Sequence, residues 1–441
     1  MGVRVKSSAR RAVPLGPDAS APVAPASEDS LRELSELART AGAVVEETIV
    51  QSRERLDSAT LVGRGKLDEI RQRLAAAGAN LLIFDAELTP TQQRNIEKIT
   101  DCRVVDRTQV ILAIFARHAR TSEGQLQVEL AQLNYLLPRL AGHGVEMSRL
   151  GGGIGTRGPG ETQLEMDRRR IRRRIALLEE SLETVRRQRM HRRSRRATIP
   201  VPTVALAGYT NAGKSTLFNQ LIPPGGTRVT ASPQMFATLD PTLRLLELPS
   251  RRRVLLSDTV GFIRNLPHTL IKAFRATLEE VCEADLILLV SDYSSPNRIQ
   301  QEADVRKVLE EIGALDRPIL HVWNKMDLLT PAERGDMRPR LQDDEDAVPI
   351  SALTGEGVDE LFGAMDRRLT VDPVERVHLR FAQRQGRELS WVYEYGRVLR
   401  REEKNGRIEV EAEVPQSLRP RLQAFITRSK TNVPVRAPSR H

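Results

Sequence analysis

The sequence predicts the α/β fold class. One large α/β domain is preceded by a small α/β domain and an antiparallel helical hairpin, and is followed by a small α+β module. Short apolar runs alternate with helical patterns along most of the 441 residues, which is typical of parallel sheets covered by helices. A glycine-bounded loop at 208–215 lies between an apolar run and a helical pattern. Two apolar stripes with helical spacing flank a glycine-rich segment at 141–160.

The loop at 208–215 has the composition and context of a phosphate-binding loop. Its sequence is Gly-Tyr-Thr-Asn-Ala-Gly-Lys-Ser, between the apolar run 204–207 and a helical pattern that begins at Thr216. The glycines let backbone N–H groups surround an anion, and the helix presents its positive N-terminal end. We expect Lys214 to reach the β- and γ-phosphates and the Ser215 hydroxyl to bind Mg²⁺, whereas a chance glycine-rich turn would not require this spacing. The predicted nucleotide contacts are Gly208, Tyr209, Thr210, Asn211, Ala212, Gly213, Lys214, Ser215 and Thr216.

Three further strings, each after an apolar run, predict which nucleotide binds: those at 258–261, 324–327 and 351–353 (Ser-Ala-Leu). In Asp258-Thr-Val-Gly261, the carboxylate can hold Mg²⁺ through water and the Gly261 N–H can contact a γ-phosphate. Asn324-Lys-Met-Asp327 ends in a carboxylate that can accept hydrogen bonds from guanine N1–H and its 2-amino group, donors that adenine lacks. In this order the strings predict a P-loop GTPase domain with guanine specificity.

The expected roles around the base are specific. Asn324 would tie its loop to the phosphate loop, Lys325 would lie along the base, and the Ala352 N–H would donate to guanine O6. The predicted contacts outside the phosphate loop are Phe236, Asp258, Thr259, Val260, Gly261, Asn324, Lys325, Asp327, Ser351, Ala352 and Leu353.

The residues for hydrolysis are less well defined. In Phe236-Ala-Thr-Leu-Asp-Pro-Thr242, a threonine must close over the γ-phosphate and Mg²⁺ in the GTP-bound form. Thr238 is the predicted switch residue and Mg²⁺ ligand, and Thr242 is the alternative. Phe262 stands where many GTPases have a water-positioning glutamine, so we expect slow hydrolysis until a partner or a cation completes the site. Asn211 is a candidate K⁺ ligand, with capping of its own loop as an equal alternative; the predicted catalytic residues are Lys214, Thr238 and Gly261.

The composition excludes several classes of protein. The net charge of +10 and the pI of about 10.0 favour a polyanionic partner. Two cysteines in separate regions argue against a disulfide framework. No apolar run is long enough to span a membrane. We therefore expect a cytoplasmic protein that does not insert into a membrane. Peripheral association with a membrane surface remains the alternative.

The N-terminal region begins with an irregular segment. Residues 1–28 are rich in Ala, Pro, Ser and Arg, which predicts a disordered basic tail. From residue 29 to residue 120 helix and strand patterns alternate, which predicts the small α/β domain. The expected helices are 31–41, 66–77, 90–99 and 109–119, and the expected strands are 43–50, 80–85 and 103–106. Val62-Gly-Arg-Gly-Lys66 could hold an anion, but it lacks the spacing and hydroxyl of a phosphate loop, and a tight turn is favoured.

Residues 121–198 predict a helical hairpin. One stripe consists of Leu126, Leu130, Leu133, Leu137 and Leu140, and the other of Ile171, Ile175, Leu178, Leu182 and Val185. Their alternating gaps of four and three residues are those of two facing helices.

The connection between the two helices predicts RNA contact. Residues 141–160 contain eight glycines, and glycine lets a backbone approach a surface closely. The second helix contains thirteen arginines against three glutamates between positions 168 and 196. A solvated face is the alternative, but this density beside a Gly/Arg tip favours RNA phosphates, and the scarcity of aromatic residues favours folded RNA. The predicted contacts are Arg149, Gly151, Gly152, Gly153, Thr156, Arg157, Gly158, Gly160, Arg168, Arg169 and Arg172.

The remaining patterns complete the expected domain organisation. After the GTPase domain at 199–371, strands at 377–381, 397–401 and 407–413 and helices at 385–395 and 415–425 predict a small α+β domain at 372–428. Residues 429–441 are expected to form a flexible tail.

From about Val62 to Leu369 the chain resembles the HflX family of ribosome-associated GTPases, in the Obg-related group. The strings that match are Asp106-Arg-Thr, Ile111-Leu-Ala-Ile-Phe-Ala116, Gln127-Val-Glu-Leu-Ala-Gln132, Tyr135-Leu-Leu-Pro-Arg-Leu140, Gly151-Gly-Gly-Ile-Gly-Thr-Arg-Gly-Pro-Gly-Glu-Thr-Gln-Leu-Glu165, Phe236-Ala-Thr-Leu-Asp240 and Asp258-Thr-Val-Gly-Phe262. The string ending at Glu165 is the most specific, and the family also has Phe at position 262.

The resemblance implies a function. In this family the hairpin and its glycine-rich loop bind the large ribosomal subunit near the peptidyl-transferase centre, and the GTP-bound protein splits stalled or idle ribosomes. It implies GTP/GDP and Mg²⁺ as ligands, ribosomal stimulation of hydrolysis, and a monomer. Some members bind ATP through the N-terminal domain, for which this sequence contains no motif. The alternative is a regulatory GTPase that recruits a protein effector and contacts RNA only incidentally.

Overall fold

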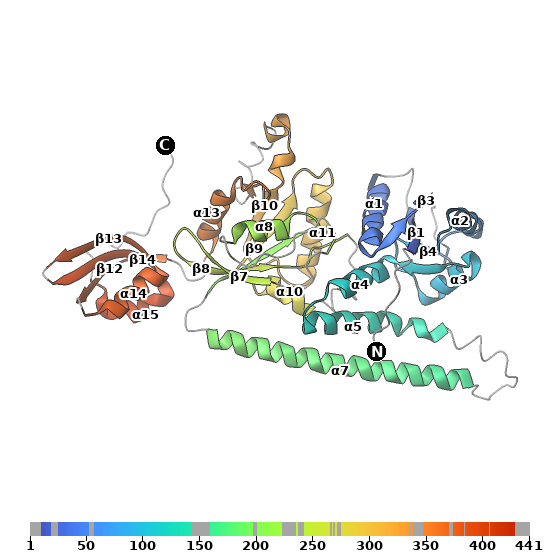
Figure 1. Ribbon diagram of the computed structural model, residues 1–441, viewed down its shortest axis with the longest axis horizontal. Coiled ribbons are helices and arrows are strands. Elements are labelled where there is room, and N and C mark those ends of the chain that lie inside the picture. Colours follow the sequence, from blue (N-terminus) through green and yellow to red (C-terminus); the bar gives the residue numbers. More distant parts are fainter. Residues whose placement is uncertain are drawn as a thin grey trace.

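The computed structural model describes three sheets and a long helix. The described residues are 10–18, 25–52, 57–142, 159–196, 201–222, 235–236, 242–264, 267, 270, 275–335, 337, 347–369, 374–382, 384–404 and 406–427. Figure 1 shows the N-terminal domain at one end, the GTPase domain in the centre and the C-terminal domain at the other end. The long helix α7 runs beneath the first two.

The N-terminal domain is a five-stranded parallel sheet, with strand order β2-β1-β4-β5 and with β3 also paired to β1. Its elements are β1 (Arg10–Asp18), α1 (Pro25–Thr40), β2 (Ala43–Val45), β3 (Ile49–Ser52), α2 (Arg64–Ala77), β4 (Leu81–Phe84), α3 (Pro90–Thr100), β5 (Arg103–Asp106) and α4 (Arg107–His118). β4 and β5 lie side by side in register, with Phe84 opposite Asp106, so Asp85 and Asp106 lie at the same carboxyl edge.

Strand β1 corrects the prediction of a disordered tail over residues 1–28. Residues 10–18 form an interior strand, and α1 already begins at Pro25. β1 contains Pro14 and Pro17, which disfavour a strand locally, and it is specified by pairing with strands far along the chain. The first half of β1 pairs with β2 and the second half pairs with β3. The single strand expected at 43–50 is therefore divided into two strands.

The helical hairpin consists of α5 (Ser122–Leu136), the short 3₁₀ helix η1 (Arg139–Gly142) and α7 (Pro159–Arg196). α5 and α7 are antiparallel and adjacent (Figure 1), as the stripes predict. Arg174 on α7 donates to both oxygens of Glu129 on α5, at 2.7 Å each. The first helix is shorter than predicted because Pro138 cannot continue it. α7 includes Pro159 and Gly160, which were assigned to the loop; residues 143–158 of that loop lie outside the described residues.

Arg139 attaches the end of this first helix to the N-terminal sheet. Its guanidinium donates to the Leu88 carbonyl at 2.7 Å and to the Asp106 carboxylate at 3.2 Å. It also lies 3.4 Å from the centroid of the Tyr135 ring. The carboxyl edge of β5 therefore fixes the chain two residues before the glycine-rich loop predicted at 141–160.

The GTPase domain is a six-stranded sheet of order β11-β10-β9-β6-β8-β7, parallel except for β7. Its elements are β6 (Thr203–Gly208), α8 (Lys214–Leu221), β7 (Thr242–Glu247), β8 (Arg253–Asp258), α10 (Arg275–Cys282), β9 (Leu286–Asp292), α11 (Arg298–Glu311), β10 (Ile319–Asn324), η2 (Met326–Leu328), β11 (Ala347–Pro349) and α13 (Val358–Arg368).

The two faces of this sheet belong to different cores. Val204 and Leu206 of β6 pack with α8 and α13, whereas the alternate residues Ala205 and Ala207 pack with α10 and α11, as the period of a strand requires. The second core continues into the N-terminal domain, where it includes residues of α1, α4 and α5. The N-terminal and GTPase domains therefore share one hydrophobic core.

The C-terminal domain is an antiparallel sheet of order β12-β14-β13 with a separate core. Its elements are β12 (Val374–Ala382), α14 (Gly386–Tyr395), β13 (Arg397–Lys404), β14 (Arg407–Pro415), η3 (Gln416–Leu418), α15 (Arg419–Leu422) and η4 (Gln423–Phe425). It has the predicted α+β composition, with the last helix divided into three short pieces.

Candidate functional site

The phosphate loop lies at the carboxyl end of β6, where parallel sheets bind ligands. Both of its glycines are required, because neighbouring atoms approach the backbone too closely for a Cβ. A Cβ at Gly208 would lie 2.2 Å from the Val290 carbonyl oxygen, and a Cβ at Gly213 would lie 2.2 Å from the Asn324 side-chain nitrogen. Gly213 also has a φ of +95° and immediately precedes α8. The loop therefore passes directly over the ends of β9 and β10 before helix α8 begins.

Lys214 is buried inside this loop. Its ammonium donates to the carbonyls of Gly208 at 3.0 Å and Tyr209 at 2.7 Å. Burial lowers the pKa of Lys214 to about 8, although nearby Asp258 opposes the shift. A lysine that can lose its proton near neutral pH is stabilised in its charged form when phosphate anions bind beside it.

Ser215 and Asp258 bring hard oxygen ligands together next to the loop. The Ser215 hydroxyl donates to an Asp258 carboxylate oxygen at 2.8 Å, and Asp258 is fully buried at the end of β8. Thr259 does not point toward this pair, because its hydroxyl donates to the Leu206 carbonyl. A hydroxyl beside a carboxylate at a helix N-terminus is a donor set that suits Mg²⁺.

The segment after Asp258 is fixed to the phosphate loop by its backbone. Thr210 N–H donates to the Phe262 carbonyl at 2.7 Å, and Phe262 N–H donates to the Gly208 carbonyl at 3.0 Å. A Cβ at Gly261 would lie 3.0 Å from the Lys214 ammonium. The Phe262 side chain is buried in the shared core, so it lies away from the loop and cannot orient a water molecule.

Asn324 joins the phosphate loop to the predicted base-binding strings. Its side-chain nitrogen donates to the Ala212 carbonyl at 2.8 Å, as the sequence predicts, and its side-chain oxygen accepts from Ala352 N–H at 2.9 Å. The second contact differs from the expectation that Ala352 donates to guanine O6. Because a side-chain amide has both a donor and an acceptor, Asn324 can form a hydrogen bond with a backbone group on each side.

The predicted base-binding carboxylate is oriented by its neighbour. Asp327 is half-buried and accepts from the Ser351 hydroxyl at 2.5 Å. Lys325 adopts a left-handed φ of +68° and pairs with Asp292 at 2.6 Å, whereas Leu353 is 75% exposed. Residue Asn211, the candidate K⁺ ligand, also has a positive φ, of +61°.

Arg334 is a contributor that the sequence analysis missed. Its guanidinium donates to the Met326 carbonyl at 2.7 Å and pairs with Glu356 at 2.9 Å. It therefore fixes the loop of Asp327 to the loop of Ser351. No motif predicts this, because the bridge depends on a residue outside both strings.

Phe236 is the clearest correction among the predicted nucleotide contacts. Its side chain is 3% exposed and packs edge-on against Phe115 of α4, with ring centroids 4.7 Å apart. Phe236 is a residue of the core shared with the N-terminal domain. Its ring is stabilised by packing there rather than by contact with a nucleotide, which was predicted from its position in the sequence. Thr238 lies outside the described residues, and the alternative, Thr242, begins β7 opposite Asp258.

The predicted RNA contacts are only partly described. Arg169 and Arg172 are exposed on α7 and Arg168 is half-buried. Gly160 belongs to α7. Arg149, Gly151, Gly152, Gly153, Thr156, Arg157 and Gly158 lie outside the described residues.

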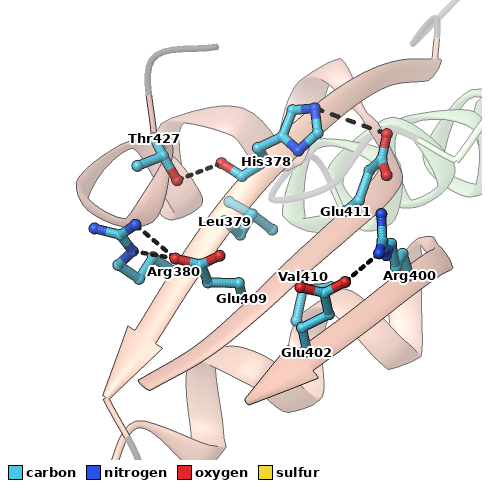
Figure 2. A pocket seen from close by; sticks show the side chains of 9 residues that line it. All are labelled: His378, Leu379, Arg380, Arg400, Glu402, Glu409, Val410, Glu411 and Thr427. Carbon is cyan, nitrogen blue, oxygen red and sulfur yellow. Dashed lines mark hydrogen bonds and ion pairs between the residues drawn. The ribbon is translucent and has the colours of Figure 1, made fainter. Parts of the chain in front are cut away.

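A hollow of about 320 Å³ lies on the C-terminal sheet and is lined by charges of both signs (Figure 2). Its carboxylates are paired with arginines: Glu409 with Arg380 at 2.5 Å, Glu402 with Arg400, and Glu411 with Arg376 at 2.7 Å. The His378 ring lies 3.7 Å from Glu411. Exposed, mutually paired charges do not favour one class of ligand, so we place the functional site in the GTPase domain.

Four family models match successive parts of the chain. Their descriptions are GTP-binding GTPase N-terminal (residues 28–116), GTP-binding GTPase Middle Region (118–196), 50S ribosome-binding GTPase (203–325) and HflX C-terminal domain (336–425). None of the helices in the described part of the chain combines the length and the apolar character that a membrane span requires.

Three relatives are similar over most of the chain, and each is named GTPase HflX. The protein of Caldanaerobacter subterraneus is 47% identical, covering 91% of this chain and 91% of its own length. That of Lacrimispora saccharolytica is 46% identical, covering 88% and 90%. That of Escherichia coli K12 is 46% identical, covering 84% and 88%.

The lowered pKa of Lys214 predicts how nucleotide affinity depends on pH. Raising the pH from about 7 to about 9.5 should weaken GDP binding, because the free protein loses the Lys214 proton and must regain it when the phosphates bind. Calorimetry in buffers of different ionisation enthalpy should show net proton uptake on binding near pH 8.5. Affinity and proton uptake that do not vary over this range would contradict the assignment. The variant Lys214→Met serves as the control that lacks the titrating group.

Proposed function

Because the chain belongs to the HflX family of GTPases, we propose that it binds the large ribosomal subunit in its GTP-bound form and dissociates stalled or idle ribosomes. The chain is a GTP-binding, ribosome-associated GTPase. The observation that best supports the proposal is that Asn324 joins the phosphate loop to the Ser351 loop, so the loops expected to bind the nucleotide are already held together. The same molecule contains the arginine-rich helix α7.

Each part of the nucleotide is assigned to residues at strand ends. Lys214 and the backbone of the phosphate loop bind the β- and γ-phosphates, and the Gly261 N–H contacts the γ-phosphate. Ser215 and the switch residue Thr238 would be ligands of Mg²⁺, and Asp258 would hold it through water. When bound, Mg²⁺ neutralises charge on the phosphates. Asp327 accepts from guanine, and its bond from Ser351 at 2.5 Å supports a fixed carboxylate orientation.

The assignment of Asp327 predicts a change of base specificity. Asp327→Asn should lose affinity for GTP and gain affinity for xanthosine triphosphate, because the amide can donate to the 2-oxo group that replaces the 2-amino group. Losing the hydrogen bonds to guanine should weaken GTP binding by about tenfold or more. Titration calorimetry with both nucleotides is the measurement, and Asp316→Asn is a control that removes an exposed carboxylate outside the predicted contacts. Equal GTP affinity in the Asp327 variant and the wild type would exclude this role.

Hydrolysis requires a group that replaces the missing glutamine. Phe262 is buried in the shared core, so its side chain cannot contribute. Asn211 would hold a K⁺ ion, which would supply positive charge to the transition state, with ribosomal contact as the stimulus.

The K⁺ assignment makes turnover depend on the cation. GTP turnover should be faster in K⁺ than in Na⁺ at matched ionic strength, and Asn211→Ala should abolish the difference, because Na⁺ is too small for the same ligand set. Turnover is measured as phosphate release, with and without large subunits. Equal rates in the two salts would leave Asn211 with only a loop-capping role.

Ribosome contact is assigned to the hairpin. The exposed positions Arg169 and Arg172 on α7 support binding to rRNA phosphates, and the glycine-rich segment is assigned to the tip that approaches the peptidyl-transferase centre. In this proposal GTP orders the switch segments and stabilises one position of the hairpin that competes with the intact ribosome, and hydrolysis releases it.

Ribosome splitting is tested by sedimentation. Wild-type protein with a non-hydrolysable GTP analogue should convert intact ribosomes to subunits, and the same protein with GDP should not. Replacing residues 151–158 with a short linker should abolish splitting while leaving GTP affinity within about twofold, since the phosphate and base loops lie in another domain.

The control for this experiment is a variant in which the removed segment is replaced by one of equal length and composition in scrambled order. A protein with the shortened segment that folds and still splits ribosomes at the wild-type rate would contradict the assignment. The wild-type protein could instead bind GTP but show no nucleotide-dependent binding to ribosomes. That result would favour a GTPase that recruits a protein effector.

A further inference from the structure

The carboxyl edge of the N-terminal sheet is occupied by protein side chains. Such an edge is where α/β sheets usually bind a ligand. Here the Arg107 guanidinium, buried at the start of α4, donates to Asp85 at the end of β4 at 2.6 Å and pairs with Glu33 of α1. The group that completes this cluster comes from the other domain. Tyr209, the second residue of the phosphate loop, donates its hydroxyl proton to the Glu33 carboxylate.

Tyr209 makes a second contact with the same oxygen. The backbone N–H of Arg264 donates to the Tyr209 hydroxyl at 2.8 Å. Burial raises the pKa of Tyr209, so the hydroxyl keeps its proton and can donate to Glu33 while it accepts from Arg264. The Arg264 side chain is also anchored, because it approaches Asp304 of α11 at 3.5 Å.

These contacts determine where Gly261 lies. The backbone beyond Gly261 is attached to the phosphate loop at Phe262, through the hydrogen bonds with Thr210 and Gly208, and again at Arg264, through the Tyr209 hydroxyl. The hydroxyl is itself held by Glu33. The N-terminal domain therefore provides the outer anchor of the segment that places Gly261 beside the Lys214 ammonium.

The cluster is suited to holding a fixed position. Glu33, Asp85 and Arg107 have side chains that are 13%, 7% and 4% exposed. Separating such charges is costly, because each would stay buried without a partner that compensates its charge. Arg107 contacts two carboxylates, so Glu33 cannot rotate away without leaving a buried cation half-paired. An exposed ion pair could not impose such a constraint.

We propose that Glu33 is a positioning residue for GTP hydrolysis, acting through the Tyr209 hydroxyl to hold the Gly261–Arg264 segment over the phosphate loop. Arg107 and Asp85 fix Glu33 from the side of the N-terminal domain. The N-terminal domain thereby completes the GTPase site without contacting the nucleotide. This inference rests on the proposed role of the Gly261 N–H at the γ-phosphate.

The test separates turnover from binding. Tyr209→Phe removes only the hydroxyl and should lower kcat about tenfold with KM changed less than about twofold, since misplacement of a reacting group mainly affects the transition state. Glu33→Ala should have the same effect, and Glu33→Gln should restore most of kcat because its side-chain oxygen still accepts from Tyr209. The matched control is Glu36→Ala on the same helix α1, since Glu36 pairs with Arg39 at the surface and should leave kcat unchanged.

The double variant gives the decisive comparison. If Glu33 acts through Tyr209, Glu33→Ala in the Tyr209→Phe background should cause no further loss of kcat. Additive losses would overturn the proposal, as would wild-type kcat in a Tyr209→Phe protein with an unchanged melting temperature. Should Glu33→Ala fail to fold, the Tyr209→Phe and Glu33→Gln proteins still decide the outcome. A wild-type chain that binds no guanine nucleotide would overturn the proposed function as well.

Discussion

The nucleotide site depends on the side chain of one buried residue, Asn324. Its amide joins the phosphate loop to the Ser351 loop through contacts of 2.8 Å and 2.9 Å. These are backbone partners from opposite sides of β10, and a buried amide that lost either one would leave an unsatisfied polar group, at a cost of about 1–3 kcal/mol. The approach is so close that only glycine fits at 213. Three loops that are far apart in the sequence are thus held as one surface.

A second constraint attaches this surface to the rest of the molecule. The core that covers one face of the GTPase sheet continues into the N-terminal domain, and the Arg107 cluster lies at their boundary. Removing one partner from a buried ion pair costs about 3–5 kcal/mol, so the two domains are expected to move together rather than independently. At the neighbouring strand end, Asp106 holds Arg139. The same sheet edge therefore contacts both the phosphate loop and the chain that leads into the predicted RNA-binding segment.

Many elements that local sequence specifies were predicted correctly, whereas β1, the Glu33–Tyr209 contact and the packing of Phe236 depend on distant residues and were not predicted. The phosphate loop and the strand before it are encoded by contiguous residues, and the contact of Asn324 with the phosphate loop follows from a short string at a strand end. β1 could not be predicted because Pro14 and Pro17 oppose a strand locally, and it forms only because β2, β3 and β4 pair with it. The Glu33–Tyr209 contact joins residues 176 positions apart, and no periodicity encodes it. Phe236 was misassigned because its burial against Phe115 depends on domain packing.

If the chain binds the large ribosomal subunit in its GTP-bound form, as we propose, its nucleotide site and its subunit-binding surface are energetically linked. Linkage is reciprocal, so if GTP strengthens binding to the large subunit, the large subunit must strengthen binding of GTP by the same factor. The most direct measurement is the dissociation rate of a fluorescent non-hydrolysable GTP analogue with saturating large subunits, with small subunits and with neither. We expect the large subunits, and not the small ones, to slow dissociation by about tenfold, which is a coupling of ordinary size. The same dissociation rate in all three mixtures would contradict this expectation.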